Sequence, residues 1–315
     1  MMVLVLLSAC RGEEGPGMHL DGEALCWMTA LADDTPLTQL SIPGAHDAAS
    51  ASVTSWTRWT RTQLLDIDGL WNCGVRAFDL RPACHDGQLV IYHGKYSANQ
   101  RFQDVMQSLL DALGKYPGET AIVLIRHEEE ADGNAALWGP VLGAYLQGIR
   151  EHLVDYRDGI TLGEMRGKIL LLSRNPYAGG PIGGYINRWN SGSGLADQCG
   201  SSVTNAAGHA SPLWVQDYYH PDGAEDKWKA VKGLWDAAST AAWPRPLIIN
   251  HTSGYVGMLP DYRENARNVN ARAADYLLQM QGPAGLVMLD FAGVSRIGGV
   301  AVSGDRLVQC IIRHN

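Results

Sequence analysis

The sequence has 315 residues, of which 46% are hydrophobic and 18% charged, so it is long enough to bury one large core. Its 36 glycines and 14 prolines are spread along the chain, and neither a fixed-period repeat nor a run of like charges divides it, so we expect a single domain. The net charge of −8 argues against a nucleic-acid partner unless basic residues gather locally in the fold.

The first ten residues predict a lipoprotein signal. An apolar run from Met1 ends in Leu7, Ser8 and Ala9, which precede Cys10 as small residues precede the lipidated cysteine of a bacterial lipobox. A basic segment before the run is missing, so an apolar start that belongs to the fold is the alternative. With Cys10 lipidated, the protein would be anchored in a bacterial cell envelope; cleavage without lipidation would release it. The expected division is a signal (1–10), an N-terminal linker (11–36) and a folded domain (37–315).

Five cysteines remain if Cys10 carries lipid, and an odd number cannot all pair within the chain. None of them shows the close spacing of a zinc site. Their pairing stays open: Cys26, Cys73, Cys84, Cys199 and Cys310.

Short apolar, β-branched runs alternate with stretches of helical periodicity, a pattern typical of parallel sheets. The expected strands are 40–42, 75–80, 89–92, 121–125, 169–172, 213–216, 247–250 and 286–289. The expected helices include 102–113, 137–153 and 226–242. The second and third strands lie too close together for a helix between them. We therefore predict an α/β fold of the distorted (β/α)8 TIM-barrel type, with an open doubly wound sheet as the alternative.

Ionisable residues follow nearly every predicted strand, where barrel enzymes place their chemistry. They are His46, Asp47, Asp79, Arg81, His93, Arg126, Arg174, Asp217, His251 and Asp290. We expect them to meet at the mouth of the barrel.

Two histidines at that mouth indicate acid–base catalysis near neutral pH, because one can accept a proton while the other donates one. His46 and His93 are the expected pair, and Asp47 and Asp290 are carboxylates available to orient them. The case for a catalytic role is weaker for His85, His127 and His251, which we expect to be surface or supporting residues.

Three arginines, Arg81, Arg126 and Arg174, would make the mouth of this acidic protein locally positive and so favour an anionic substrate. Asp79 and Arg81 are two residues apart, so both side chains leave the same face of a strand; an ordinary ion pair is the structural alternative. Because Arg81 stands where a metal ligand would be wanted, we expect phosphoryl chemistry with neither metal nor cofactor.

Three segments of the sequence are notable together: residues 41–47 (SIPGAHD), 74–81 (GVRAFDLR) and 91–94 (IYHG). They resemble the X-domain of bacterial phosphatidylinositol-specific phospholipase C, and the likeness continues from Leu40 through nearly the whole chain. The resemblance implies a distorted barrel that cleaves phosphatidylinositol to diacylglycerol and inositol 1,2-cyclic phosphate without a metal.

The resemblance also implies a role for each residue. His46, supported by Asp290, would be the general base on the inositol 2-hydroxyl, and His93, supported by Asp47, the general acid. Arg81 would hold the phosphate. The implied ring-binding and supporting residues are Asp79, Arg126, Glu128, Arg174, Asp217 and Tyr219.

Two departures from the family motif and one membrane feature accompany this resemblance. Ala48 stands where the family usually has Ser or Thr, and Arg126 stands where it has a ring-contacting lysine, which leaves headgroup preference open. Trp56 and Trp59 fall where the family carries a short membrane-touching helix, and indole rings suit that interface.

The expected partners are an inositol phospholipid or glycosyl-phosphatidylinositol substrate and a membrane surface, with the protein a monomer that binds no nucleic acid. Two alternatives remain. One is a phosphodiesterase acting on another ester, such as a sphingolipid or a glycerophosphodiester, since a fold does not settle the substrate. The other is a non-enzymatic lipoprotein that binds its ligand on the same barrel.

Overall fold

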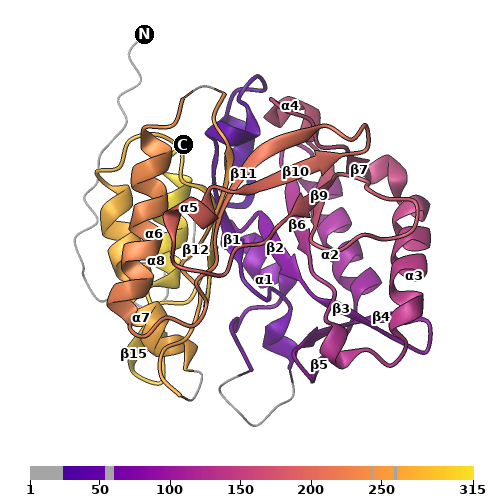
Figure 1. The fold of residues 1–315 in the computed structure, drawn as a ribbon, viewed down its shortest axis with the longest axis horizontal. Helices are drawn as coiled ribbons and strands as arrows, with labels where there is room; N and C mark the ends of the chain where they lie inside the picture. Colours follow the sequence, from indigo (N-terminus) through magenta and orange to yellow (C-terminus); the bar gives the residue numbers. More distant parts are fainter. Residues whose placement is uncertain (1–23, 54–59, 243, 259–260) are drawn as a thin grey trace.

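The computed structural model describes residues 24–53, 60–242, 244–258 and 261–315 (Figure 1). Cys10, Trp56 and Trp59, together with the predicted signal, lie outside these ranges. Among the described helices, none has the length and apolar character that a membrane span requires.

Nine strands of the described chain close into a barrel. In spatial order these are β6 (Ala121–Ile125), β2 (Ala77–Leu80), β1 (Ser41–Ala45), β13 (Gly285–Leu289), β12 (Leu247–His251), β11 (Ala210–Gln216), β10 (Ser201–Asn205), β9 (Gly184–Asn187) and β8 (Ile169–Ser173), and β8 pairs with β6. Neighbouring strands are parallel, except that β10 runs antiparallel to β9 and β11. The predicted α/β barrel is therefore confirmed.

The strand membership of the barrel differs from the prediction. The third predicted strand corresponds to β4 (Gln88–His93), which lies outside the barrel in a separate antiparallel sheet with β3 (Pro82–His85) and β5 (Tyr96–Arg101). The eight-strand count missed β9 and β10. Their sequences, GYIN and SSVTN, are too polar to produce the apolar runs on which the prediction depended.

Helices surround the barrel, with α2 (Phe102–Lys115) and α3 (Ala135–Gly148) on one side and α6 (Ala224–Ser239), α7 (Tyr262–Leu277) and α8 (Gly304–Ile312) on the other (Figure 1). The sequence predicted α2, α3 and α6. It missed α7, whose buried face is made largely of alanine and asparagine. The remaining elements are short: α1 (Ile67–Asn72), α4 (Leu162–Met165), α5 (Leu195–Gln198), β7 (Leu153–Val154), β14 (Arg296–Ile297), β15 (Val300–Ala301) and the 3-10 turns Ala24–Ala30, Leu37–Gln39, Ser50–Ser52, Glu129–Ala131 and Arg150–His152.

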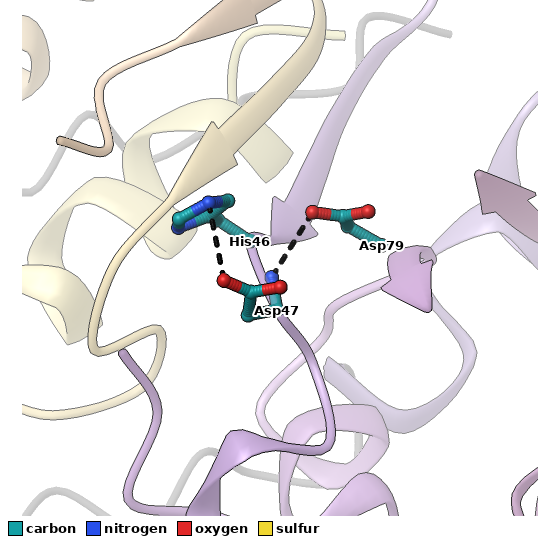
Figure 2. Close-up of side chains that lie close together, drawn as sticks. All are labelled: His46, Asp47 and Asp79. Carbon is teal, nitrogen blue, oxygen red and sulfur yellow. Dashed lines mark hydrogen bonds and ion pairs between the residues drawn. The ribbon is translucent and has the colours of Figure 1, made fainter. Parts of the chain in front are cut away.

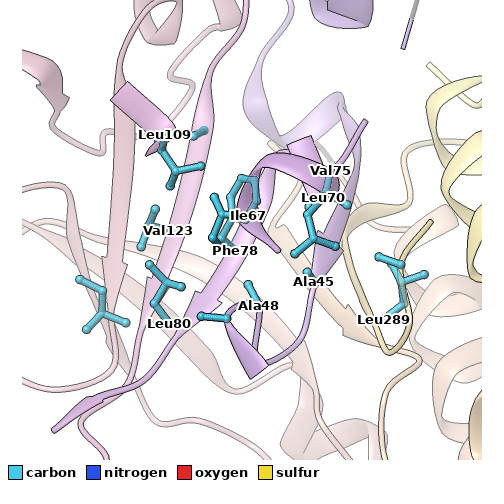
Figure 3. Packing of buried hydrophobic residues seen from close by; sticks show 14 of the residues in the cluster. Ala45, Ala48, Ile67, Leu70, Val75, Phe78, Leu80, Leu109, Val123 and Leu289 are labelled. Atoms are coloured by element: carbon cyan, nitrogen blue, oxygen red, sulfur yellow. The ribbon is translucent and has the colours of Figure 1, made fainter. Parts of the chain in front are cut away.

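The barrel strands bury both of their faces, in two separate cores. Inward-facing side chains such as Ile42, Leu124 and Val215 fill the barrel. The alternate side chains, among them Phe78 and Val123, pack outward against the helices (Figure 3). This period of two follows from strand geometry and sets the direction of every residue near a strand end.

A buried ion pair joins the N-terminal ends of the strands to the segment that precedes the barrel. Arg76 and Glu119 are both fully buried, and their Nε and Oε2 atoms are 3.0 Å apart. Glu119 also accepts hydrogen bonds from the backbone N–H groups of Met28 and Thr29. The guanidinium of Arg76 donates to the carbonyl of Leu25 and lies 3.8 Å from the centre of the Trp71 ring. The pair therefore fixes residues 24–30 against the barrel.

We predict that Glu119→Gln lowers the free energy of unfolding by about 3–5 kcal/mol, because it leaves the buried Arg76 cation without its counter-charge. Urea denaturation followed by circular dichroism measures the change. Asp104→Asn, which breaks the exposed ion pair between Arg101 and Asp104, is the control and should leave the midpoint unchanged. A Glu119→Gln midpoint equal to that of the wild type would contradict this role.

Candidate active site

Seven barrel strands carry a polar side chain at the inward position that follows their apolar core residues. Inward residues alternate with outward ones, so Met288 is followed two positions later by Asp290, and Leu124 by Arg126. The same spacing sets the others: His46, Asp79, Arg174, Asp217 and His251. The chain thus gathers its predicted site residues at the C-terminal end of the barrel, as expected.

A pocket of about 430 Å³ opens at that end. Three of the predicted site residues, Asp47, Asp79 and Asp290, lie behind its wall, buried against the residues they support. The others line it: His46, Arg81, His93, Arg126, Glu128, Arg174, Asp217 and Tyr219.

Asp290 orients His46 from the adjacent strand. Its Oδ1 is 2.8 Å from His46 Nδ1, and its Oδ2 accepts a hydrogen bond from the backbone N–H of Gly254. The carbonyl of His46 accepts hydrogen bonds from the side chains of Thr62 and Gln63. Backbone and ring are therefore both held, and His46 Nε2 is directed toward the pocket.

The carboxylate of Asp47 contacts Arg81 and both histidines, His46 and His93, at the base of the pocket. The backbone of Asp47 has a φ of +44°, a conformation that aspartate tolerates better than most residues. Its Oδ1 lies 2.6 Å from Arg81 Nε, and its Oδ2 lies 3.4 Å from His46 Nε2 and 3.3 Å from His93 Nε2. The sequence assigned Asp47 to His93, whereas the carboxylate contacts both histidines.

His93 reaches the site from β4, in the small sheet outside the barrel. Its Nδ1 is 2.9 Å from the carbonyl oxygen of Thr60, which can only accept, so Nδ1 carries a proton. The other ring nitrogen, Nε2, faces Asp47 and lies 3.4 Å from the hydroxyl of Tyr262. His93 therefore presents Nε2 to the pocket, as His46 does.

Arg81 lies between the carboxylates of Asp47 and Asp79. Its Nη2 is 2.9 Å from Asp79 Oδ2, and its Nε is 2.6 Å from Asp47 Oδ1. His46, Asp47 and Asp79 converge closely enough to offer three ligand atoms within 4.8 Å of one another (Figure 2). The guanidinium already forms ion pairs with both carboxylates, so these donors do not fit a divalent cation as they stand.

Two neighbouring buried histidines have opposite pKa shifts. Burial lowers the pKa of His46, but the negative charges of Asp47 and Asp290 outweigh it and raise the value to about 9. Burial dominates at His251, whose pKa falls to about 3, so this ring is neutral at pH 7. The two ring centroids are only 5.8 Å apart. The site therefore places a proton on His46 and withholds one from His251.

The far wall of the pocket combines a cation, an indole and a carboxylate. The guanidinium of Arg174 lies 4.1 Å from the centre of the Trp189 ring, and Trp189 Nε1 donates a 2.8 Å hydrogen bond to Asp217 Oδ2. Burial lowers the pKa of Arg174 to about 10, although the negative charge of Asp217 opposes the shift. Arg126 Nη2 lies 3.8 Å from Glu128 Oε1. Burial is the main cause of the raised pKa of Glu128.

Sequence reasoning missed several lining residues, among them Trp189 and Tyr262. Trp189 follows the polar strand β9, and Tyr262 begins α7, so neither stands at the end of a predicted strand. His251, which we expected to be a surface or supporting residue, is buried beneath the pocket in edge-to-face contact with His46.

Three of the described cysteines, Cys73, Cys84 and Cys199, are free thiols.

Comparison with known proteins gives the same picture. No protein-family model matches the chain. It is 27% identical over 276 residues to 1-phosphatidylinositol phosphodiesterase of Listeria monocytogenes, covering 84% of this chain and 80% of that protein. Its fold matches a variant of phosphatidylinositol-specific phospholipase C from Staphylococcus aureus with a TM-score of 0.75 and 23% identity, over 91% of this chain and 97% of the other.

The phospholipase structure from Listeria monocytogenes matches with a TM-score of 0.71 and 24% identity, over 93% of this chain and 98% of the other. The chain is similar, in sequence and in fold, to the bacterial phosphatidylinositol-specific phospholipases C, which confirms the resemblance that its motifs indicate.

Proposed function

We propose that this protein cleaves phosphatidylinositol to diacylglycerol and inositol 1,2-cyclic phosphate. The observation that carries the proposal is the contact of one carboxylate, Asp47, with Arg81, His46 and His93 at the base of the pocket. This arrangement supplies a base, an acid and a phosphate-binding cation within a single cluster.

In the proposed reaction, His46 Nε2 takes the proton of the inositol 2-hydroxyl, and the oxygen attacks the phosphorus of the same molecule. His93 donates its Nε2 proton to the glycerol oxygen as the bond from phosphorus to that oxygen breaks. Asp290 stabilises the imidazolium formed on His46 through the 2.8 Å contact at Nδ1. Both nucleophile and leaving group belong to one bound substrate, so orientation within the pocket supplies much of the acceleration.

Arg81 would offset the charge that develops on the phosphoryl oxygens, a task that a metal ion performs in other phosphodiesterases. Burial acts to lower the pKa of Arg81, but the negative charges of Asp47 and Asp79 raise it well above its usual value. Arg81 is therefore a cation at every relevant pH. We therefore propose that the reaction is independent of calcium and of any cofactor.

The ring-binding wall and the membrane contact complete the proposal. Arg126, Glu128, Arg174, Asp217 and Tyr219 would hold the inositol hydroxyls, with Asp79 fixing Arg81. The lipid on Cys10 and the indoles of Trp56 and Trp59 would keep the enzyme at a bilayer, on the outer side of a bacterial envelope. A monomer suffices for this chemistry, because all the groups named belong to one chain.

The first test is cleavage of phosphatidylinositol in mixed vesicles, with product detection by ³¹P NMR. We expect the five-membered cyclic phosphate signal to appear at equal rates with and without EDTA. His46→Ala and His93→Ala should each lower kcat about 10²–10⁴-fold, because each removes one proton-transfer group.

His209→Ala, at an exposed histidine far from any strand end of the site, is the matched control and should retain full activity. Loss of activity in EDTA would contradict the role given to Arg81. Activity confined to a sphingolipid or a glycerophosphodiester would leave the chemistry intact but replace the substrate.

The pH dependence gives a second test, because a base must lose its proton before it can act. With the pKa of His46 raised to about 9, kcat/KM should rise with pH toward 9 on the acid side of the profile. Asp290→Asn removes one of the charges that raise this pKa, so the rising limb should move to lower pH while the maximal rate falls. If the rising limb of the Asp290→Asn profile stays at the wild-type pH, a group other than His46 controls it.

A further inference from the structure

A lysine on α6 is buried behind the wall of the pocket. Lys227 has no exposed surface, and burial lowers its pKa to about 8. Burying an ammonium group is unfavourable unless nearby dipoles and charges compensate for its lost hydration. The catalytic scheme above does not use this residue, so its presence calls for a cause in the structure around it.

The ammonium group of Lys227 contacts the residues on both sides of Asp217. Nζ donates to Gln216 Oε1 at 3.2 Å and to the carbonyl oxygen of Tyr218 at 3.0 Å. The backbone N–H of Tyr218 donates to the same Gln216 Oε1 at 2.8 Å. These three hydrogen bonds close a ring around the end of β11, so Lys227 fixes the backbone on either side of Asp217.

Gln216 extends this arrangement to the next strand. Its Nε2 donates to Asn250 Oδ1 at 2.8 Å and to the carbonyl oxygen of His251 at 2.7 Å. Asn250 in turn donates to the carbonyl oxygen of Val231, one turn further along the helix of Lys227. Strands β11 and β12 and helix α6 are therefore tied together by polar side chains on the outer face of the barrel.

Asp217, which these contacts hold, has one carboxylate oxygen to spare. Oδ2 accepts from Trp189 Nε1, whereas Oδ1 is buried and makes no hydrogen bond to any described residue; the nearest polar ring atom, Nδ1 of His251, is 3.6 Å away. Burial acts to raise the pKa of this carboxyl, but His251, Lys227 and Arg174 hold it below its usual value. Asp217 lines the pocket, so its ionised carboxylate is an acceptor available to a ligand hydroxyl.

We propose that Lys227 is a positioning residue for recognition of the inositol ring. From outside the barrel it holds the 216–218 segment in place and provides positive charge behind Asp217, which then accepts a hydrogen bond from a ring hydroxyl. This inference rests on the proposed function, because Asp217 is a ring-binding residue only if the substrate carries such a ring.

The test uses myo-inositol as a competitive inhibitor of phosphatidylinositol cleavage in vesicles. Lys227→Met keeps the apolar stem but removes the charge and its hydrogen bonds, and should raise the inhibition constant of myo-inositol and KM by about tenfold. kcat should fall by a smaller factor, since His46 and His93 are untouched. Lys229→Met, at an exposed lysine two residues along the same helix, is the control and should change neither constant.

A double-mutant cycle separates positioning from a general effect on stability. In an Asp217→Asn background, Lys227→Met should change the inhibition constant less than twofold, because the residue through which it acts has lost its charge. Lys227→Gln keeps an N–H donor, so its inhibition constant for myo-inositol should lie between those of the wild type and Lys227→Met. This variant replaces Lys227→Met if the latter does not fold.

Three outcomes would overturn the proposal. Additive effects of Lys227→Met and Asp217→Asn would mean that the lysine does not act through the carboxylate. If Lys227→Met and Lys227→Gln both cleave phosphatidylinositol with an unchanged inhibition constant for myo-inositol, this inference alone would be wrong. A wild-type protein with no cleavage and no inhibition by myo-inositol would remove the proposed function with it.

Discussion

Along each parallel strand of the barrel, side chains alternate between the interior and the surrounding helices, and the site depends on that alternation. The inward positions are apolar until the strand nears its C-terminal end, where the next inward position carries a charge or an imidazole, as in Met288 and Asp290. A shift of one residue in any strand would turn such a group toward the helices and an apolar one into the pocket. The same register therefore determines both the packing of the core and the geometry of the site.

Within that frame, the central electrostatic unit is a cation enclosed by two carboxylates. Arg81 contacts Asp47 and Asp79, and Asp47 contacts both histidines. Arg81, Asp47, Asp79 and His46 are buried, and each compensates the desolvation of its neighbour, so removing one would change the charge state of the others. The raised pKa of His46 and the lowered pKa of Asp79 are two results of this one arrangement.

The sequence was sufficient to predict the barrel and the residues at its strand ends, because apolar runs such as 121–125 and 286–289 mark buried parallel strands by composition alone. It was insufficient for β9 and β10, whose antiparallel, partly polar strands lack that composition, and therefore for Trp189, which depends on them. It placed β4 in the barrel because a strand sequence carries no information about its pairing partners. It could not identify Lys227, since a lysine on an amphipathic helix is common on surfaces, and it did not predict that His251 is buried against His46.

The small sheet of β3, β4 and β5 contributes no strand to barrel closure, yet it delivers His93. The two histidines that we propose as the proton-transfer pair thus stand on separate sheets, which meet through Asp47 and through the carbonyl of Thr60. Under the proposed roles, a substitution in this sheet would alter the surroundings of the acid without disturbing the barrel register that fixes the base. The environment of the leaving group could then be changed separately from that of the nucleophile.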